Sequence, residues 1–416
     1  MKSSPIAPAA DELQPETRTA SPGEVFRVFL KLGLTSFGGP IAHLGYFRDE
    51  LVTRRKWLGE ADFADLVALC QFLPGPASSQ IGFALGLLRG GPLGALAAWC
   101  AFTLPSAFLL IAFALAAPAF NGPLGTSLIH GLKIVAVAVV AQAVWSMART
   151  LTPDKTRAGI ALAALMVIVF LGGSFAQIAA IVLGGVAGYW LCRSGGAAPN
   201  GHLAFRVSRG VGIGALMIFF ALLAGLPLLA ALTRAHGIAL ANSFYHAGSL
   251  VFGGGHVVLP LLEAQVVPPG WISADRFLAG YGAAQAVPGP LFTFAAYLGA
   301  AMTPTPNGFL GAALCLAAVF LPGLLLVIGA LPYWDALRLR PGAQAVMRGT
   351  NAAVVGILGA ALYNPVWTSA IHESRDFALA LTGFALLTVW RAPPWIVVVL
   401  LAAATVVLSV SLVPSP

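Results

Sequence analysis

The chain has 416 residues, of which 58% are hydrophobic and only 9% are charged, with a formal net charge of +8. Soluble globular proteins carry about 25% charged residues, so this composition excludes a protein with an ordinary water-facing surface. In lipid, spanning structure is restricted to helices or a closed barrel, because every backbone polar group must be paired internally. The apolar runs are long and continuous, without the alternation of barrel strands. The sequence therefore predicts an all-α polytopic membrane protein.

Residues 1–23 are rich in Pro, Ala, Ser and Glu and contain no apolar core. They predict a disordered cytoplasmic tail and not a signal peptide, which needs an apolar stretch of about 7–15 residues. Apolar segments follow at about 25–46, 66–88, 93–117, 130–148, 158–172, 175–192, 209–232, 240–262, 277–300, 308–333, 346–366, 376–390 and 394–413. A crossing needs about 20 residues, so 158–172 and 376–390 are short.

The apolar segments contain an internal repeat. Phe29, Gly33 and Phe37-Gly38-Gly39 recur 215 residues later as Phe244, Gly248 and Phe252-Gly253-Gly254. Trp57, Gln71 with Pro74-Gly75-Pro76, and Gly94 with Pro105 recur as Trp271, Gln285 with Pro288-Gly289-Pro290, and Gly311 with Pro322. Landmarks in one order at a nearly constant offset indicate a tandem duplication. We predict a first membrane repeat at 24–192 and a second at 239–413, separated by a linker (193–238) that holds one unpaired transmembrane helix.

The unpaired segment at 209–232 sets the relative orientation of the repeats. If each repeat crosses an even number of times, one extra crossing inverts the second repeat. Basic residues cluster in three loops: Arg149, Lys155, Arg157; Arg193, Arg206, Arg209; and Arg338, Arg340, Arg348. Placing these loops in the cytoplasm with the N-terminus agrees with the positive-inside rule and leaves corresponding loops on opposite sides. The sequence therefore predicts inverted-topology repeats.

The loop with Arg48, Arg54, Arg55 and Lys56 leaves two topologies open. If the first segment crosses fully, this loop lies outside, and the basic residues divide into 15 inside and six outside. If the first two segments are re-entrant hairpins, the division is 18 inside, three outside and two in the membrane. Gly and Pro at 36–40 and 74–76 break helices, which favours broken or re-entrant helices.

Two lysines, Lys31 and Lys133, lie within apolar segments, whereas the carboxylates lie in the tail, in loops or at segment ends. A charged group in the hydrocarbon region is costly and commonly functional. A core with cations and without carboxylates suits an anion. The repeat aligns Lys31 with His246 and Lys133 with Asn351. The alternative is that both lysines extend to the membrane interface.

Four Gly/Pro breaks, at 36–40, 74–76, 252–255 and 288–290, occupy matching places in the two repeats. Interrupted helices expose free N–H groups and the positive ends of helix dipoles, which bind anions. The alternative is that these residues only kink packed helices. Gln71 and Gln285 are expected to be buried beside the breaks, whereas His43 and His256 do not correspond by offset. The candidate substrate-binding residues are Lys31, Ser36, Gly38, Gly39, Gln71, Pro74, Gly75, Pro76, Ser78, Ser79, Lys133, His246, Gly253, Gly254, Gly255, Gln285, Pro288, Gly289, Pro290, Thr293 and Asn351.

Other chemistry leaves no signature in the sequence. Cys70, Cys100, Cys192 and Cys315 stand singly and predict small buried hydrophobic residues. Walker, zinc-protease and Gly-x-Ser-x-Gly motifs are missing, and no basic patch with interleaved aromatics indicates nucleic acid. We expect no catalytic residues, no metal and no cofactor. A membrane-embedded enzyme is the alternative class, and it would need an acid–base or metal group at membrane depth.

The run from Phe29 to Pro40, followed by Gln71 to Pro76, resembles the chromate ion transporter (CHR) family, and Phe252 to His256 with Gln285 to Pro290 resembles that family's second domain. The resemblance covers nearly all of residues 25–413 and is to the long-chain, two-domain members. It implies a bacterial inner-membrane protein that exports chromate, with antiparallel homologous halves.

We therefore predict a secondary transporter for a tetrahedral divalent oxyanion, with chromate efflux and chromate resistance as its role. The alternatives are a transporter or channel for sulfate or another oxyanion. The expected partners are the oxyanion and the lipid bilayer; the oligomeric state is open, with a homodimer as one option.

Overall fold

The computed structural model describes residues 20–117, 122–193 and 207–411, and the regular structure within these ranges is helical. The first repeat contains α1 (Pro22–Thr35), α2 (Gly39–Phe47) continued by a π-helical turn η1 (Arg48–Arg54), α3 (Glu60–Phe72), α4 (Ala77–Ala116), α5 (Pro123–Leu151), α6 (Lys155–Leu171) and α7 (Gly173–Leu191). The helix α8 (Arg209–Thr233) follows, in the place predicted for the unpaired segment.

The second repeat follows the same order. It contains α9 (His236–Ser249), a 3-10 turn η3 (Gly255–Val257) continued by α10 (Val258–Val266), α11 (Ala274–Ala284), η4 (Leu291–Thr293) with α12 (Phe294–Ala301), α13 (Gly308–Ala330), η5 (Leu331–Tyr333) with α14 (Trp334–Arg338), α15 (Pro341–Ala361), η6 (Leu362–Trp367) with α16 (Thr368–Ala370), α17 (Ser374–Thr388) and α18 (Pro394–Ser411). The predicted tail lies outside the described residues up to residue 19, and α1 begins at Pro22, where Ser21 caps the helix. Of the predicted linker, 194–206 also lie outside them.

The first two segments of each repeat are re-entrant hairpins. With 14 residues in α1 and 13 in α3, each helix is only about 20 Å long and cannot cross about 30 Å of hydrocarbon. Arg55 lies 4.0 Å from Glu24, and Ala20 N–H donates to the carbonyl of Arg89 at 2.9 Å. Both hairpins therefore end at the level where α1 begins, and the re-entrant interpretation is the one that the structure adopts.

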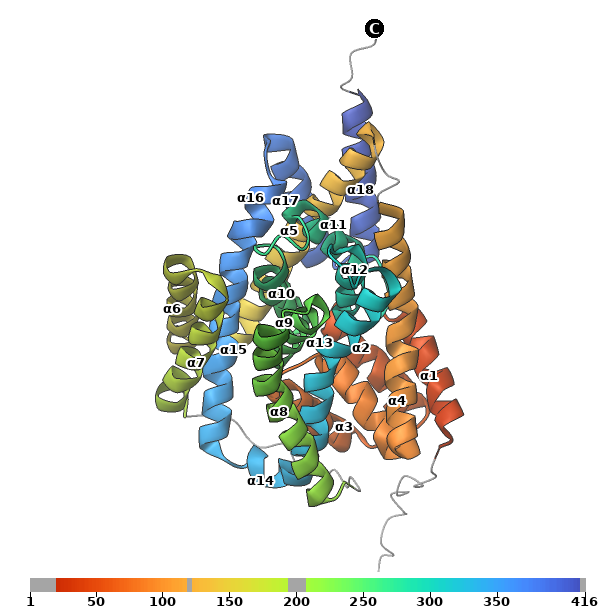
Figure 1. Cartoon of the computed structure of the whole chain (residues 1–416), viewed down its shortest axis with the longest axis vertical. Coiled ribbons are helices and arrows are strands. Elements are labelled where there is room, and N and C mark those ends of the chain that lie inside the picture. The colour runs from red at the N-terminus through yellow and green to blue at the C-terminus, as the bar shows by residue number, and fades with distance from the viewer. Residues whose placement is uncertain (1–19, 118–121, 194–206, 412–416) are drawn as a thin grey trace, which may run out of the picture.

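The second repeat closes its hairpins in the same way. The ring of His236, the first residue of α9, lies 4.8 Å from the ring of Trp271, which follows α10. Thr303 N–H, just after α12, donates to the carbonyl of Trp271 at 3.0 Å. In Figure 1 the first hairpins begin at the lower end of the molecule and the second hairpins at its upper part, so the two repeats are inverted.

Longer helices complete each repeat. Among the described residues, five helices, including α8 between the repeats, are long and apolar enough to cross a membrane: Ala77–Ala116, Leu124–Leu151, Arg209–Thr233, Gly308–Arg338 and Pro341–Ala370. The first of these is two helices in succession, because Gly90 and Gly91 leave helical geometry and Gly91 has a φ of +63°. The chain turns back there, since Gly86 packs directly on the backbone of Gly94.

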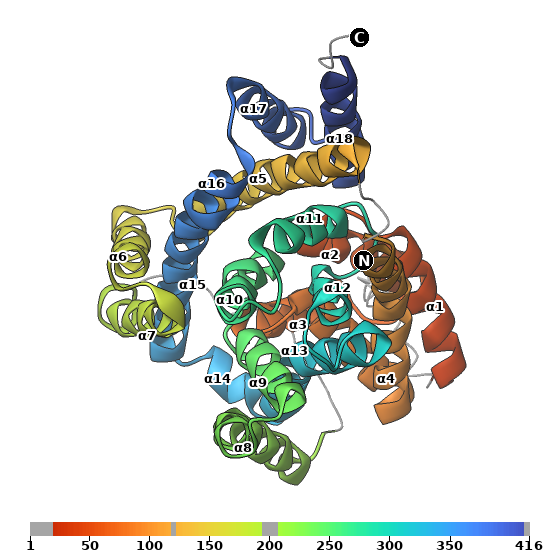
Figure 2. The ribbon, with the colours of Figure 1, turned by 45° about the horizontal axis from the view of Figure 1, so that its top comes forward.

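The repeats exchange their last helices. Helices α17 and α18 pack on α5 of the first repeat, and α6 and α7 pack on α15 of the second. Figure 2 shows α5 and α15 as an arc with these pairs outside it and α9 to α13 grouped inside. Equivalent glycines permit both contacts: Gly131 on α5 packs against Ala402, and Gly349 on α15 packs against Gly184 and Gly188. The two repeats are therefore joined through their last helices.

Candidate functional site

The four helix breaks meet in two pairs, each made of one break from each repeat. The N–H of Gly75 donates to the carbonyl of Val251 at 2.7 Å, and the N–H of Gly289 donates to the carbonyl of Ser36 at 2.8 Å. Gly75 corresponds to Gly289 and Ser36 to Val251 in the repeat, so the same hydrogen bond is made twice with the repeats exchanged. The breaks therefore lie at the contact between the two repeats.

Glycine is required at the centre of each Pro-Gly-Pro break. Gly75 has a φ of +127° and Gly289 a φ of +99°, a region that side chains with a Cβ rarely occupy. A Cβ at Gly75 would lie 3.0 Å from the Cα of Gly323, and one at Gly289 would lie 2.9 Å from Oγ of Ser106. The flanking prolines have no N–H to continue a helix. These residues end one helix and begin the next at a fixed contact with the other repeat.

The glycine-rich breaks also approach each other. Gly38, which precedes α2, and Gly39, which begins it, have φ values of +98° and +77°. A Cβ at Gly39 would lie 3.8 Å from Nε2 of His256, and one at Gly255 would lie 3.3 Å from the ring of Pro40. The N–H groups in the first turn of α2 have no acceptor within the helix. The free N–H groups of α2 therefore lie next to residues of the second repeat.

Buried polar atoms without a partner gather at these breaks. Within the described residues, they include Oγ of Ser36 and Ser79, Nε2 of His43 and Gln285, Oε1 of Gln80, and Oδ1 of Asn351. An unpaired buried polar group costs about 1–3 kcal/mol. Such atoms also occur elsewhere in the described residues, for example at His236 and Asn242, so those at the breaks favour a polar ligand together with the helix ends that meet there. Asn351 belongs to the group because its Oδ1 lies 3.6 Å from the Cβ position of Gly253.

Other polar groups fix the breaks in place. Nε2 of Gln80 donates to the carbonyls of Pro74 and Gly323 at 2.9 and 3.0 Å, which ties the first Pro-Gly-Pro to α13 of the other repeat. Oγ1 of Thr293 donates to the carbonyl of Pro290 at 2.7 Å and ties the second Pro-Gly-Pro to the turn that follows it. Ser78 lies 3.2 Å from Nδ1 of His43.

Both lysines predicted for the site are paired with carboxylates. Nζ of Lys31 lies 2.9 Å from Oε2 of Glu50, and the Lys31 side chain is half exposed. Nζ of Lys133 lies 2.8 Å from Oδ1 of Asp275 and also donates to the carbonyl of Ser369. The sequence does not reveal these pairs. Glu50 reaches Lys31 from a re-entrant turn, and Asp275 reaches Lys133 from the other repeat.

Two further predicted residues face away from the breaks. His246 donates from Nε2 to the carbonyl of Leu223 on α8 at 3.1 Å. Gln71 is exposed and Gln285 is half-buried, so the expectation that Gln71 is buried is wrong. Its helix, α3, lacks the cover that α5 gives to α11.

Glu50 forms a charged cluster at the end of the first hairpin. Its carboxylate lies 2.9 Å from Lys31, Arg54 and Arg55. Burial raises the pKa of the Glu50 carboxyl, but the hydrogen bonds from Lys31 and Arg55 outweigh this and hold the pKa below its ordinary value. This cluster stabilises the hairpin turn and is separated from the break by the helix α2.

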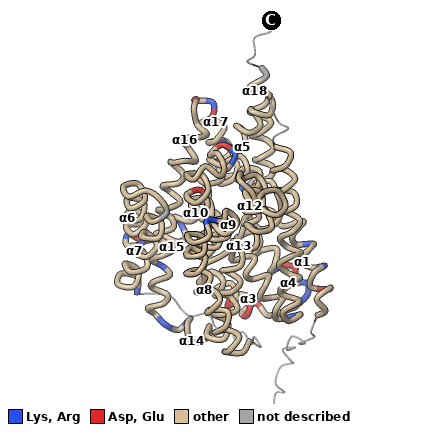
Figure 3. The backbone as a smooth tube through the Cα atoms, in the orientation of Figure 1, with Lys and Arg blue, Asp and Glu red and all other residues tan. Residues whose placement is uncertain are grey.

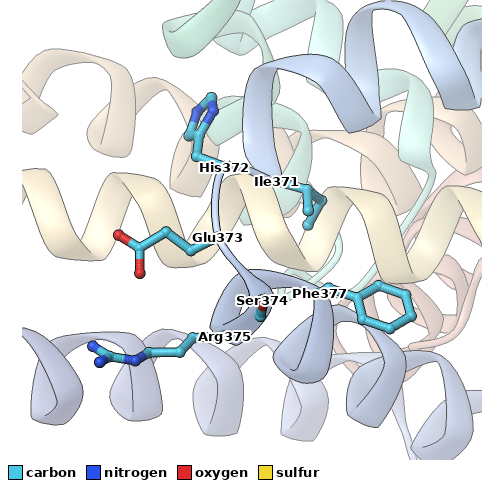
Figure 4. Close-up of a pocket in the computed structure, with 6 residues that line it drawn as sticks. All are labelled: Ile371, His372, Glu373, Ser374, Arg375 and Phe377. Atoms are coloured by element: carbon cyan, nitrogen blue, oxygen red, sulfur yellow. The ribbon is translucent and has the colours of Figure 1, made fainter.

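Two pockets of the described residues lie outside the cluster of breaks. One, of about 690 Å³, lies at the loop between α16 and α17, where Glu373 and Arg375 point to one side and Phe377 to the other (Figure 4). The other, of about 610 Å³, is apolar and lies between α4, α5 and α18; Ala286 and Val287 line it just before the second Pro-Gly-Pro. The breaks themselves are packed.

Sequence reasoning set aside or missed five residues at the breaks: His43, Gln80, Ser106, His256 and Tyr281. The histidines were discounted because they do not correspond by offset. Their place about one turn after a glycine break was the available signal. Tyr281, fully buried beside the second break, left no signal because an apolar helix accommodates a tyrosine without any ligand.

This architecture defines a class: a multi-pass membrane transporter of inverted repeats, with broken helices between the repeats. The chromate transporter family matches residues 23–189 and 238–407. The chain therefore belongs to the chromate transporter family.

Curated relatives match along most of the chain. It is 28% identical to a "Probable chromate transport protein" of Synechococcus elongatus over 92% of this chain and 95% of that protein. It is 28% identical to a "Chromate transport protein" of Pseudomonas aeruginosa over 91% of this chain and 90% of that one. An uncharacterized transporter of Methanocaldococcus jannaschii is 26% identical over 80% of this chain and 82% of its own length. No solved structure matches the chain.

Proposed function

We propose that this protein is a secondary transporter that exports chromate across the bacterial inner membrane and thereby confers chromate resistance. The observation that carries the proposal is the exchanged pair of hydrogen bonds, Gly75 to Val251 and Gly289 to Ser36. They bring four broken helices together between inverted repeats. Unpartnered buried polar atoms lie at the same place, as expected for a site that replaces the water around an oxyanion.

The binding residues follow from this placement. We assign oxyanion binding to Ser36, Gly38, Gly39, Pro74, Gly75, Pro76, Ser79, Gly253, Gly254, Gly255, Gln285, Pro288, Gly289, Pro290, Thr293 and Asn351. Ser78, whose hydroxyl faces Nδ1 of His43, takes part in the site through that contact. Lys31, Gln71, Lys133 and His246 lie outside this cluster. For these four we propose a role in the approach of the anion to the breaks. Lys133, for example, pairs with Asp275 of the other repeat beside α11.

Outward movement is favoured by the membrane potential, which contributes about 2.3 kcal/mol per charge per 100 mV for an anion leaving a negative interior. The proposal places the N-terminus in the cytoplasm. In support, Figure 3 shows blue Lys and Arg positions toward the lower end, where α1 begins and α14 lies, as the positive-inside rule expects for a cytoplasmic face.

Alternating access would move the repeats against each other. Two ion pairs join the repeats at opposite ends: Arg338 on α14 lies 3.0 Å from Asp65 on α3, and Lys133 lies 2.8 Å from Asp275 on α11. Figure 1 places α3 and α14 low and α11 high. Pairs at these positions are suited to close one face while the other opens.

The alternative function is transport of sulfate or another oxyanion, or a channel. Sulfate has the same tetrahedral shape and charge as chromate, and hydroxyl and amide donors recognise both. The names of the relatives favour chromate.

The test is chromate uptake by everted membrane vesicles that contain the protein, with sulfate as competitor. We expect saturable uptake, counterflow from vesicles preloaded with chromate, and weak competition by sulfate. Vesicles without the protein and vesicles with Gly75→Ala are the controls. Sulfate uptake without chromate uptake would instead select the alternative substrate, and flux without saturation or counterflow would indicate a channel.

A further inference from the structure

Two histidines, one in each repeat, are held in the same way beside the breaks. His43 lies on α2 and His256 on η3, in each case shortly after a glycine break. Nδ1 of His43 lies 3.2 Å from Oγ of Ser78, and Nδ1 of His256 lies 2.7 Å from the hydroxyl of Tyr281. In both repeats the hydroxyl comes from the hairpin that carries Pro-Gly-Pro. Each imidazole therefore links the two hairpins of its own repeat.

This likeness is not a relic of the duplication. The histidines are 213 residues apart, whereas the glycine breaks before them are 215 apart. Ser78 follows the first Pro-Gly-Pro, whereas Tyr281 precedes the second. Different residues thus produce the same arrangement in both repeats: an imidazole fixed through Nδ1 by a hydroxyl. A packing contact inherited by copying would have used corresponding positions.

The hydroxyl partners determine which ring nitrogen carries the proton. A hydroxyl that donates to Nδ1 leaves the proton of a neutral imidazole on Nε2. We assign this tautomer to both rings, so that each Nε2–H is a hydrogen-bond donor. His43 is fully buried, and its ring lies edge-on to Phe102 at 5.4 Å. The backbone of Ser36 lies beside the ring, and among the described residues Nε2 makes no hydrogen bond of ordinary geometry.

The second donor faces the first break. Nε2 of His256 lies 3.8 Å from the position that a Cβ of Gly39 would take. Gly39 begins α2, the helix that carries His43 one turn later. The two imidazoles and the first turn of α2 thus lie around one break, with groups from both repeats.

We propose that His43 and His256 bind the transported oxyanion through Nε2–H, one from each repeat, with Ser78 and Tyr281 as positioning residues. This inference rests on the proposed function and deepens it. Two neutral donors form charge-assisted hydrogen bonds to a dianion. They need no fixed positive charge at the breaks, which agrees with the pairing of Lys31 and Lys133 to carboxylates.

The test compares asparagine with glutamine at each histidine. Glutamine places its amide nitrogen near the position of imidazole Nε2, whereas asparagine places its own near Nδ1. We measure chromate binding to the purified full chain in detergent by equilibrium dialysis. For His43→Asn and His256→Asn we expect affinity to fall roughly ten- to hundredfold, and for His43→Gln and His256→Gln to stay within about threefold of wild type.

His236→Asn is the matched control. His236 begins α9, packs on the ring of Trp271, and lies about 20 Å along the helix from the break. We expect it to bind chromate like wild type. The positioning role has a separate readout, because Tyr281→Phe should shift the His256 proton between the ring nitrogens in ¹⁵N spectra. Ser78→Thr, which keeps the hydroxyl, should bind better than Ser78→Ala.

The outcomes separate this inference from the proposed function. If the asparagine variants bind like wild type, the histidines do not contact the anion and the inference is wrong. Equal loss in the asparagine and glutamine variants, with elution like wild type on size exclusion, would show that the intact ring matters and not the Nε2 donor, which also overturns it. If the wild-type chain binds neither chromate nor sulfate, the proposed function fails, and this inference fails with it.

Discussion

The re-entrant hairpins of the two repeats share a backbone plan but differ in what surrounds them. The loop and helix ends at 48–65 in the first repeat hold Arg48, Glu50, Asp65 and further charged residues. The matching stretch of the second repeat holds far fewer charges, and its helices α10 and α11 are largely buried. Helix α11 packs along α5, whereas α3 is joined to α14 through the buried pair of Asp65 and Arg338.

The comparison shows which features both repeats retain. Positive-φ glycines and the exchanged hydrogen bonds are the same in both repeats, because they set the position of the breaks. The outer contacts diverged, since the two sets of hairpins begin at opposite ends of the molecule. The first repeat is secured by ion pairs and the second by apolar packing.

The largest effect is expected at the buried ion pair that joins α3 of the first repeat to α14 of the second. Asp65 is fully buried, with Arg338 and the indole N–H of Trp334 each 3.0 Å from its Oδ1. Asp65→Asn removes the buried carboxylate and leaves Arg338 with its exposed partner Asp335 at 2.9 Å, so it should lower the free energy of unfolding by about 3 kcal/mol. Asp275→Asn, in the second repeat, changes an exposed partner and should cost about 1 kcal/mol or less. Denaturant unfolding in detergent measures both, and equal losses would refute the contrast.

Substitution of the central glycines should affect both repeats alike. Gly75→Ala and Gly289→Ala force a Cβ into positive-φ backbone, which costs about 1–2 kcal/mol each, and into close contact with the other repeat. We expect both to abolish chromate uptake in vesicles. Gly159→Ala, in an open position of α6, is the control and should transport normally. Normal uptake by either break variant would contradict the equivalence of the breaks.

Gln80 offers a smaller and one-sided test. Its two hydrogen bonds join the first break to α13, whereas the corresponding position of the second repeat is Phe294. Gln80→Leu should lower stability by about 1–3 kcal/mol and also impair uptake. Gln177→Leu removes the hydrogen bond to the Pro260 carbonyl away from the breaks, so it should lower stability alone. Impaired uptake in both variants would mean that stability, and not the break, limits transport.

The smallest effect is expected for Glu50 and should depend on pH. Because hydrogen bonds from Lys31 and Arg55 hold its pKa below the ordinary value, the ionised group stabilises the fold at neutral pH. That contribution is lost as the pH falls through the folded-state pKa, which lies below the ordinary value of a glutamate. Glu50→Gln should therefore lower stability by about 1 kcal/mol at pH 7 and approach wild type in acid. A pH-independent difference between the two unfolding curves would exclude this cause.

The sequence predicted the repeat, the inversion and the four breaks, because glycines and prolines at a constant offset are readable without tertiary structure. It did not predict which breaks meet, since the hydrogen bond from Gly75 to Val251 joins residues in different repeats. For the same reason it left Lys133 unpaired, although Asp275 reaches it from α11. Gln71 was expected to be buried because it precedes a Pro-Gly-Pro break, as Gln285 does, but its helix lacks the cover that α5 gives to α11.

The central claim is that one oxyanion site is built from buried polar groups of both repeats. Ser36→Ala and Asn351→Leu each remove such a group that has no partner in the protein. Removing an unpaired buried polar group should not destabilise the fold, so the two effects separate. Chromate affinity and the unfolding midpoint of the purified variants test this claim most directly. We predict that affinity falls about tenfold in each while the midpoint stays at or above that of wild type; wild-type affinity in either variant would contradict the account.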